Sequence, residues 1–182
     1  MVPMRALFAV LMFAVTIPLG WSAEQSRAPQ WRVYFSPHGG CTEAVVAALK
    51  AARSTIHVQA YSFTSVPIAQ ALIDAHRRGV KVHVVLDKSQ RGEKYTSATM
   101  LKNAGVDCAI DAKHSIAHNK VMVIDGTTVI TGSFNFSMAA EKSNAENLLV
   151  IPDAELAKKY MSNWEMHRQH SEVYEGLGSK AR

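Results

Sequence analysis

The sequence alternates between segments patterned as β-strands and segments patterned as helices, and this alternation constrains the fold more than any other feature. The run from 80 to 87 is almost continuously apolar, which is typical of a strand buried on both faces. Strands are also expected at 31–36, 55–64, 106–110 and 146–151, and helices at 42–53 with Thr42 as N-cap, 67–78, 94–103 and 154–167. The prediction is an α/β fold in which a mixed β-sheet is sandwiched between helices.

The N-terminus differs from the rest of the chain. Arg5 is followed by an uncharged apolar run and then by Pro, Gly and small residues, as in a secretory signal peptide. We expect a signal peptide at 1–22, cleaved after Ser22 or Ala23, and a single domain at 23–182, located in the periplasm or secreted. Stable membrane association is not expected after cleavage, although an uncleaved anchor is the alternative reading of the same run.

The charge balance favours an anionic partner without identifying one. The chain has 20 Lys and Arg against 15 Asp and Glu, a formal net charge of +5. Lys88, Arg91 and Lys94 fall in and just after the loop that follows the buried strand, where sheets of this kind usually bind ligands. These three residues are candidates for contact with a nucleic-acid backbone, with a solvated basic loop as the alternative.

Two cysteines and eight histidines require separate consideration. An exported chain permits a disulfide between Cys41 and Cys108, but two buried thiols acting as small hydrophobes are equally compatible with the sequence. The histidines form neither an HExxH motif nor a Cys/His cluster at zinc spacing. The sequence therefore predicts no metal site.

A possible reaction centre surrounds the dipeptide Asp125-Gly126. This pair lies between two β-rich runs and predicts a two-residue hairpin loop, which would set Lys120 opposite Thr131 and His118 opposite Ser133. Side chains two residues apart share one face of a strand. An imidazole, an ammonium, a hydroxyl and an amide are therefore expected on one side of the sheet, from His118, Lys120, Ser133 and Asn135.

These four groups suit a phosphodiester. Lys120 supplies a cation, Ser133 and Asn135 supply neutral donors, and an imidazole can attack phosphorus or move a proton. The alternative is an ordinary solvated strand face. Phe134 and Phe136 alternate with the polar positions, so we expect them in the core rather than stacked on bases.

The same residues fit the pattern His-x-Lys-x4-Asp-x6-Gly-Ser-x-Asn, through which the chain resembles the phospholipase D superfamily: His118, Lys120, Asp125, Gly132, Ser133 and Asn135. Within that superfamily it is similar to the small secreted bacterial endonucleases of the Nuc type. The likeness includes the short length, the single motif, Tyr61-Ser62-Phe63-Thr64 and Ser143-Asn144-Ala145-Glu146-Asn147. The resemblance implies a phospholipase D-like fold with one motif per chain.

The resemblance also implies a mechanism. Larger members carry two motifs, so a single motif implies a homodimer in which two copies of His118 share one active site. One imidazole attacks phosphorus to give a phosphohistidine, and the other protonates the leaving oxygen. Lys120 and Asn135 hold the phosphate with support from Ser133, Glu146 orients His118, and Asp125 has a structural role. No cofactor or divalent ion is expected.

The substrate is less constrained than the chemistry. The favoured function is a non-specific endonuclease acting on DNA and also on RNA. The alternative is a lipid phosphodiesterase of the phospholipase D or cardiolipin hydrolase type, which should show an apolar surface near the site where a nuclease should show a basic one. A nucleic-acid-binding module without activity is a third reading, against which the intact motif argues.

Overall fold

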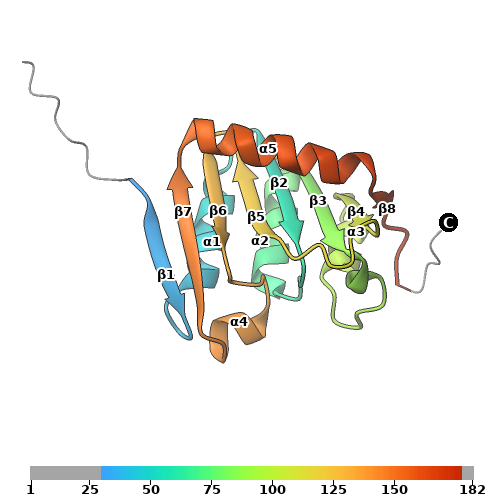
Figure 1. Cartoon of the computed structure of the whole chain (residues 1–182), viewed down its shortest axis with the longest axis horizontal. Coiled ribbons are helices and arrows are strands. Elements are labelled where there is room, and N and C mark those ends of the chain that lie inside the picture. Colours follow the sequence, from blue (N-terminus) through green and yellow to red (C-terminus); the bar gives the residue numbers. More distant parts are fainter. Residues whose placement is uncertain (1–29, 178–182) are drawn as a thin grey trace, which may run out of the picture.

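A computed structural model describes residues 30–177, which form one mixed eight-stranded sheet with helices on both faces (Figure 1). The strand order is β1-β7-β6-β5-β2-β3-β4-β8. The strands are β1 (Arg32–Ser36), β2 (Thr55–Ala60), β3 (Lys81–Asp87), β4 (Asp107–Asp111), β5 (Lys120–Ile124), β6 (Thr128–Gly132), β7 (Glu146–Pro152) and β8 (Glu172–Val173). The helices are α1 (Cys41–Ala51), α2 (Val66–Arg77), the 3-10 helix η1 (Lys88–Arg91), α3 (Ala98–Asn103), α4 (Met138–Lys142) and α5 (Ala154–Gln169).

Strand direction determines which segments meet. Strands β2, β3 and β4 are parallel, whereas β5, β6, β7 and β1 continue the sheet with antiparallel pairs. The ends of β2, β3, β4, β6 and β1 therefore lie at the same edge as the starts of β5 and β7. This edge, where Ala60 pairs with Lys120 and Ser36 pairs with Glu146, is called the C-terminal edge of the sheet.

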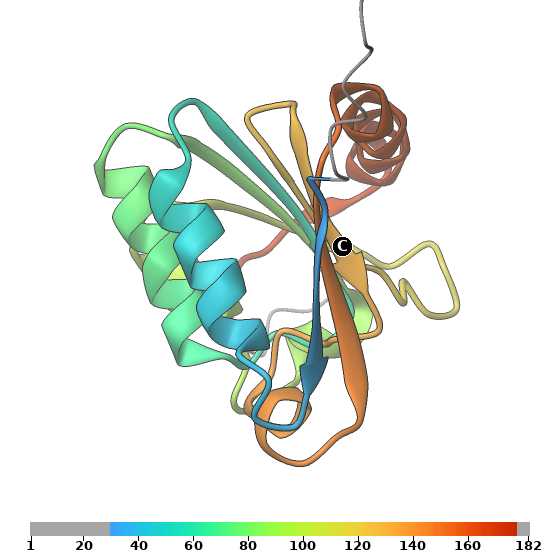
Figure 2. The same cartoon turned by 90° about the vertical axis from the view of Figure 1, so that its left-hand side faces the viewer.

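Each face of the sheet has its own core. Helices α1 and α2 cover one face and α5 covers the other (Figure 2). Along β5, Met122 and Ile124 belong to the large core on the α1/α2 side, and Val121 and Val123 to the core beneath α5. This alternation follows from the two-residue period of a strand. The predicted mixed sheet between helices is confirmed.

Some predicted boundaries are wrong. Thr42 is not the N-cap of α1, because Gly40 occupies that position with a φ of 79°. The backbone N–H of Thr42 instead donates to Glu141 Oε2 at 2.7 Å, so a carboxylate from α4 satisfies the helix terminus. The helix expected from Lys94 begins only at Ala98, and η1 occupies the expected loop before it.

The possible disulfide is also absent. Cys41 and Cys108 are free, buried thiols. Helix α1 begins at Cys41 and contacts β1 and β7, whereas Cys108 lies in β4 near the other end of the sheet. Burial raises the pKa of Cys41 to about 11 and that of Cys108 to about 12, with nearby carboxylates adding to the effect. The alternative expectation, two buried thiols without a disulfide, is therefore confirmed.

The predicted signal peptide at 1–22 lies outside the described residues. Between residues 30 and 177 no helix has the length and apolar character needed to cross a bilayer.

Candidate active site

The C-terminal edge of the sheet gathers the motif residues from three segments. Lys120 is the first residue of β5, and His118 lies in the segment of residues 112–119 that leads into it. Ser133 and Asn135 follow the end of β6, and Glu146 begins β7. The edge thus brings together residues that are up to 28 positions apart in the sequence.

The hairpin between β5 and β6 is one residue longer than predicted. Asp125 and Gly126 have φ angles of 53° and 65°, and the N–H of Thr127 bonds to the carbonyl of Ile124, as a tight turn requires. The strands nevertheless pair Ile124 with Thr128, which leaves Thr127 unpaired between turn and strand. The expected pairs Lys120–Thr131 and His118–Ser133 are therefore wrong.

A bulge at the end of β6 brings the motif serine to the site. The N–H groups of Ser133 and Phe134 both donate to the carbonyl of Asn147, at 3.1 Å each, so two residues oppose one. Gly132 has a φ of 143°, and a Cβ there would lie 2.3 Å from the same carbonyl oxygen. Only glycine fits this position, which gives the Gly-Ser pair of the motif its physical basis.

Phe134 and Phe136 are fully buried, in agreement with the predicted core role. Phe136 packs edge-to-face on Phe63, with ring centroids 6.3 Å apart. Its carbonyl also accepts the N–H groups of Thr64 and Ser65. These contacts fix the segment that carries Asn135 against the segment that follows β2.

Tyr61 joins His118 and Lys120 in one contact group. Its ring centroid lies 4.6 Å from that of His118 and 5.1 Å from Lys120 Nζ. Lys120 Nζ also donates to the carbonyl of His118 at 2.8 Å. In the sequence, Tyr61 contributes to the resemblance but is not predicted to be a site residue. Its position directly after a strand that ends at the C-terminal edge was the available signal for a site role.

Two polar groups at this edge have unusual surroundings. Lys120 is only 6% exposed, and burial lowers the pKa of its ammonium, with Glu146 acting in the opposite direction. The buried Oδ1 of Asn135 has no hydrogen-bond partner. The desolvated ammonium of Lys120 can bind an anionic oxygen strongly, since it need not first give up a full shell of water. Asn135 Oδ1 is an acceptor, so this amide can donate to such an oxygen only through Nδ2.

Ser133 and Glu146 both have hydrogen-bond partners in the protein. Ser133 Oγ accepts from the backbone N–H and the side-chain Nδ2 of Asn147, at 3.0 and 3.3 Å, which leaves its own proton free to donate. Glu146 Oε1 accepts from Asn144 Nδ2 at 3.2 Å. The hydrogen bonds found within residues 30–177 do not include one between Glu146 and His118, so the orienting role of Glu146 stays a prediction.

Asp125 lies at the opposite end of the hairpin from Lys120. Its carboxylate accepts the backbone N–H groups of Arg53, Ser54 and Thr55 at 2.8–3.2 Å, and the hydroxyl of Ser54 at 2.8 Å. Burial alone would raise the pKa of Asp125, but these bonds hold it below its usual range. The carboxylate thus ties the hairpin to the connection between α1 and β2, far from any phosphate at Lys120.

The three basic candidates have different environments. Lys88 and Lys94 are exposed, and Lys94 Nζ lies 5.3 Å from the ring of Tyr95. Arg91 is instead paired with Glu172 at 2.5 Å, with its side chain 16% exposed. Its charge is already compensated inside the protein, so Lys88 and Lys94 are better placed than Arg91 to meet a polyanion.

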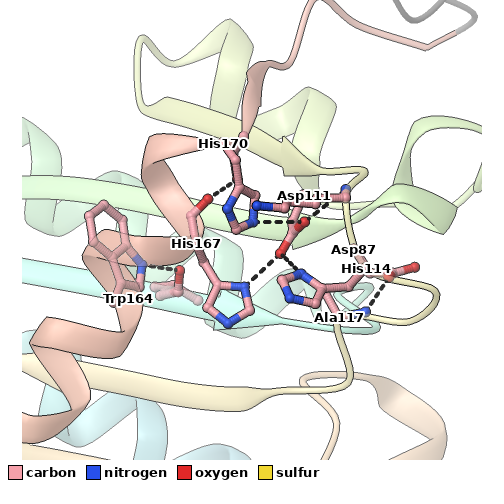
Figure 3. A network of polar contacts seen from close by, with 10 residues as sticks. Asp87, Asp111, His114, Ala117, Trp164, His167 and His170 are labelled. Carbon is pink, nitrogen blue, oxygen red and sulfur yellow. Dashed lines mark hydrogen bonds and ion pairs between the residues drawn. The ribbon is translucent and has the colours of Figure 1, made fainter.

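A second group of reactive side chains was missed by the sequence analysis, which predicted no metal site. Asp111, His114, His167 and His170 place their ligand atoms within 4.8 Å of one another (Figure 3). Two of them come from the end of β4 and two from the end of α5. The signal available in the sequence was a pair of three-residue spacings, Asp111 to His114 and His167 to His170.

Comparison with known families assigns the chain. The model of the family described as "Cardiolipin synthase, PLD-like domain" matches residues 45–168, most of the described chain. The chain belongs to the phospholipase D superfamily. It is accordingly a phosphodiesterase of that superfamily, and the resemblance inferred from the motif is confirmed.

Curated relatives of this superfamily member carry lipid-related names. The chain is 44% identical over 140 residues to a phospholipase D of Rickettsia typhi, covering 77% of this chain and 69% of the relative. It is 29% identical over 144 residues to the human mitochondrial cardiolipin hydrolase, covering 79% and 57% of the two chains. The matched region thus spans 69% of the first relative and 57% of the second.

Solved structures share the fold over nearly their whole length. Nuc of Salmonella typhimurium, a phospholipase D family member, matches with a TM-score of 0.78 at 35% identity, covering 81% of this chain and 99% of Nuc. NucT of Helicobacter pylori matches with a TM-score of 0.74 at 24% identity, covering 80% and 99%. The second likeness concerns the fold alone.

Proposed function

We propose that this phospholipase D superfamily member is an endonuclease that hydrolyses DNA, and RNA by the same chemistry, through a phosphohistidine and without a metal ion at the reacting phosphate. The observation that carries the proposal is the contact of His118 with the desolvated Lys120 at the C-terminal edge of the sheet, to which Asn135 adds an amide that can donate through Nδ2. It combines a nucleophile with two groups suited to phosphate oxygens.

The reaction requires two copies of His118, one from each subunit of a two-fold dimer. The neutral imidazole of one copy forms a bond to phosphorus as the bond to the leaving oxygen breaks. The imidazolium of the other copy gives that oxygen its proton. Water then attacks the phosphohistidine while the second imidazole takes a proton from it, which restores the starting state. Lys120 and Asn135 of each chain bind the non-bridging oxygens, and Glu146 orients the imidazole.

Exposed apolar side chains around the site support self-association. Phe35, Val66, Ile116 and Met138 are each more than half exposed and lie in segments at the C-terminal edge. Ile116 is only two residues from His118. A second copy that brought its own His118 to the same phosphate would cover this surface. Replacement of Ile116 by Glu should therefore lower both the mass in solution and the rate of cleavage.

Basic side chains at the same edge support a nucleic-acid substrate. Lys88, Lys94, Lys113 and Lys142 are exposed, and all lie in segments at or next to the ends of strands there. They can contact a phosphate backbone without reading bases, which predicts non-specific binding that weakens as salt is added. The signal peptide proposed at 1–22 would deliver such a nuclease to the periplasm or the medium.

A lipid phosphodiesterase is the second candidate, for two reasons. The exposed apolar side chains at the C-terminal edge are of the kind that a lipid enzyme would use for docking, and curated relatives are named phospholipase D and cardiolipin hydrolase. The two functions differ in what Ile116 contacts, which is a second copy of the chain in the nuclease and a lipid surface in the lipid phosphodiesterase. Under the lipid reading, Ile116→Glu abolishes vesicle binding and leaves the dimer intact.

One experiment tests the proposal. The mature protein and its His118→Ala variant are incubated with plasmid DNA, RNA and phospholipid vesicles, each with and without EDTA, and the mass in solution is measured. We expect a dimer that cleaves nucleic acid in EDTA, with no cleavage by the variant. Hydrolysis of phospholipid alone would favour the lipid candidate, and an active monomer or a fully active variant would overturn the mechanism.

A further inference from the structure

We propose that Asp111, His114, His167 and His170 form a binding site for one divalent transition-metal ion, most suitably zinc, separate from the phosphate site. The inference does not rest on the proposed function, because none of these residues belongs to the phosphodiesterase motif. They are the group of metal-type ligands found within residues 30–177.

The fold assembles the site from two local pairs. Asp111 is the last residue of β4, and His114 follows in the segment of residues 112–119. His167 lies in the last turn of α5, and His170 is the residue that caps it. Because residues three apart on a helix share one face, both imidazoles can turn toward the end of β4. The two pairs are more than 50 positions apart in the sequence but face each other in Figure 3.

One buried carboxylate lies at the centre of the three imidazoles. Asp111 is fully buried, and its Oδ2 lies 2.9 Å from His114 Nδ1 and 2.6 Å from His167 Nδ1. His170 Nε2 lies 3.2 Å from Asp111 Oδ1 as an ion-pair contact, and it is a buried nitrogen without a hydrogen bond. Three imidazoles therefore lie against one carboxylate, although only two of them make a hydrogen bond to it.

The ring positions suit a tetrahedral ion. The three ring centroids are 4.7, 5.2 and 5.6 Å apart. Imidazoles bound to zinc at about 2.0–2.1 Å in tetrahedral geometry have centroids roughly 5 Å apart. Three nitrogens and one carboxylate oxygen are borderline ligands, which favour zinc over calcium or magnesium. The two shortest nitrogen–oxygen distances must lengthen by about 0.5 Å to fit an ion of this geometry.

The proposed ion would cross-link two parts of the molecule. His114 belongs to the segment that runs to His118, and α5 covers the opposite face of the sheet from α1 and α2 (Figure 2). The same segment is fixed nearer to His118 by the N–H of Ala117, which donates to Asp87 Oδ2 at 2.7 Å (Figure 3). Four protein ligands leave no open position, so the ion would be structural rather than catalytic.

The test is metal binding by the purified protein, prepared without a histidine tag and stripped with EDTA. Titration with Co²⁺ should give the intense visible absorption of a four-coordinate ion at one equivalent per chain, and Zn²⁺ should displace it. The double variant His167→Ala/His170→Ala should bind Zn²⁺ at least about 100-fold more weakly, because it lacks two ligands.

His83→Gln is the matched control, since His83 Nδ1 also pairs with a carboxylate, that of Asp107 at 2.9 Å, but without further imidazoles on it. This variant should bind Zn²⁺ as the unaltered protein does. If the double variant fails to fold by circular dichroism, His114→Gln in the loop replaces it. Absence of the Co²⁺ spectrum from the unaltered protein, or equal Zn²⁺ affinity in all folded variants, would overturn the proposal.

Discussion

The two proposed histidine-containing sites are built in different ways. The phosphate site takes His118 and Lys120 from adjoining positions and completes them with residues just beyond the next strand. The Asp111 site joins the end of β4 to the end of α5, with no contiguous motif. The first could be recognised in the sequence because its motif residues lie close together, in and around one hairpin. The second depends on how a C-terminal helix crosses the sheet, which a sequence pattern does not encode.

The largest contrast between the two sites should appear in catalysis. His118→Ala removes both nucleophile and general acid from the proposed dimer and should lower kcat for plasmid cleavage by about 10⁴-fold. His167→Ala removes the same type of side chain from the other site and should change kcat less than about threefold, since it touches no reacting atom. Similar losses in both variants would remove the distinction between a catalytic and a structural site.

Lys120→Met sharpens the comparison within the phosphate site. It preserves side-chain length but removes the desolvated cation, and we expect kcat to fall by about 10²- to 10³-fold. Lys88→Met removes an exposed cation and should act mainly on KM, with a smaller salt dependence of binding. The two variants are compared by steady-state kinetics at several salt concentrations. An unchanged kcat in Lys120→Met would rule out a role for its charge in the reaction.

The Asp111 site should respond to metal where the phosphate site does not. A free Zn²⁺ concentration about 1,000 times the Kd should raise Tm by roughly 10 °C, because the ion binds only the folded chain. Differential scanning calorimetry measures the shift. EDTA should reverse it while DNA cleavage at 25 °C persists. If EDTA abolished cleavage, the variant His167→Ala/His170→Ala would show whether loss of metal from the Asp111 site is the cause. It should then be inactive without chelator as well.

A smaller effect is expected from Asp125→Asn, which weakens the anchor of the hairpin. Bonds from a charged acceptor contribute more than neutral ones, so unfolding free energy at pH 7 should fall by about 1–3 kcal/mol. The folded-state pKa of Asp125 is lowered, so its contribution is fully present above the unfolded value of about 4. It is lost as pH falls through the folded value. Urea unfolding of both proteins should therefore converge in acid, and a constant difference would contradict this origin.

The sequence predicted the layers of the fold because its strands alternate cleanly or are wholly apolar, as at β3 and β5. It failed where a contact between distant segments decides the local structure. Glu141 replaces Thr42 at the start of α1, and Asp125 anchors a turn that leaves Thr127 unpaired. The expected hairpin register was wrong for this reason.

The sequence predicted that four motif residues lie at one place in the fold, but not how the backbone brings them there. His118, Lys120, Ser133 and Asn135 meet at one edge, yet they do so through the bulge at Gly132 rather than through simple cross-strand pairing. A one-residue error in register turns a side chain to the other face, and a one-residue bulge corrects it. Composition and spacing cannot reveal two compensating changes of that kind.

Because Asp125 is bound to the loop before β2, the spacing of the motif fixes the position of Lys120 as well as supplying its charge. Lys120 is the first residue of the five-residue strand β5 and Asp125 directly follows its last, so one lies at the C-terminal edge and the other is bound to the loop before β2. The number of residues between them therefore determines on which face of the sheet Lys120 lies. A homologue with one residue more in this interval would present its lysine to the layer beneath α5, and would need a second bulge to return the charge to the reaction centre.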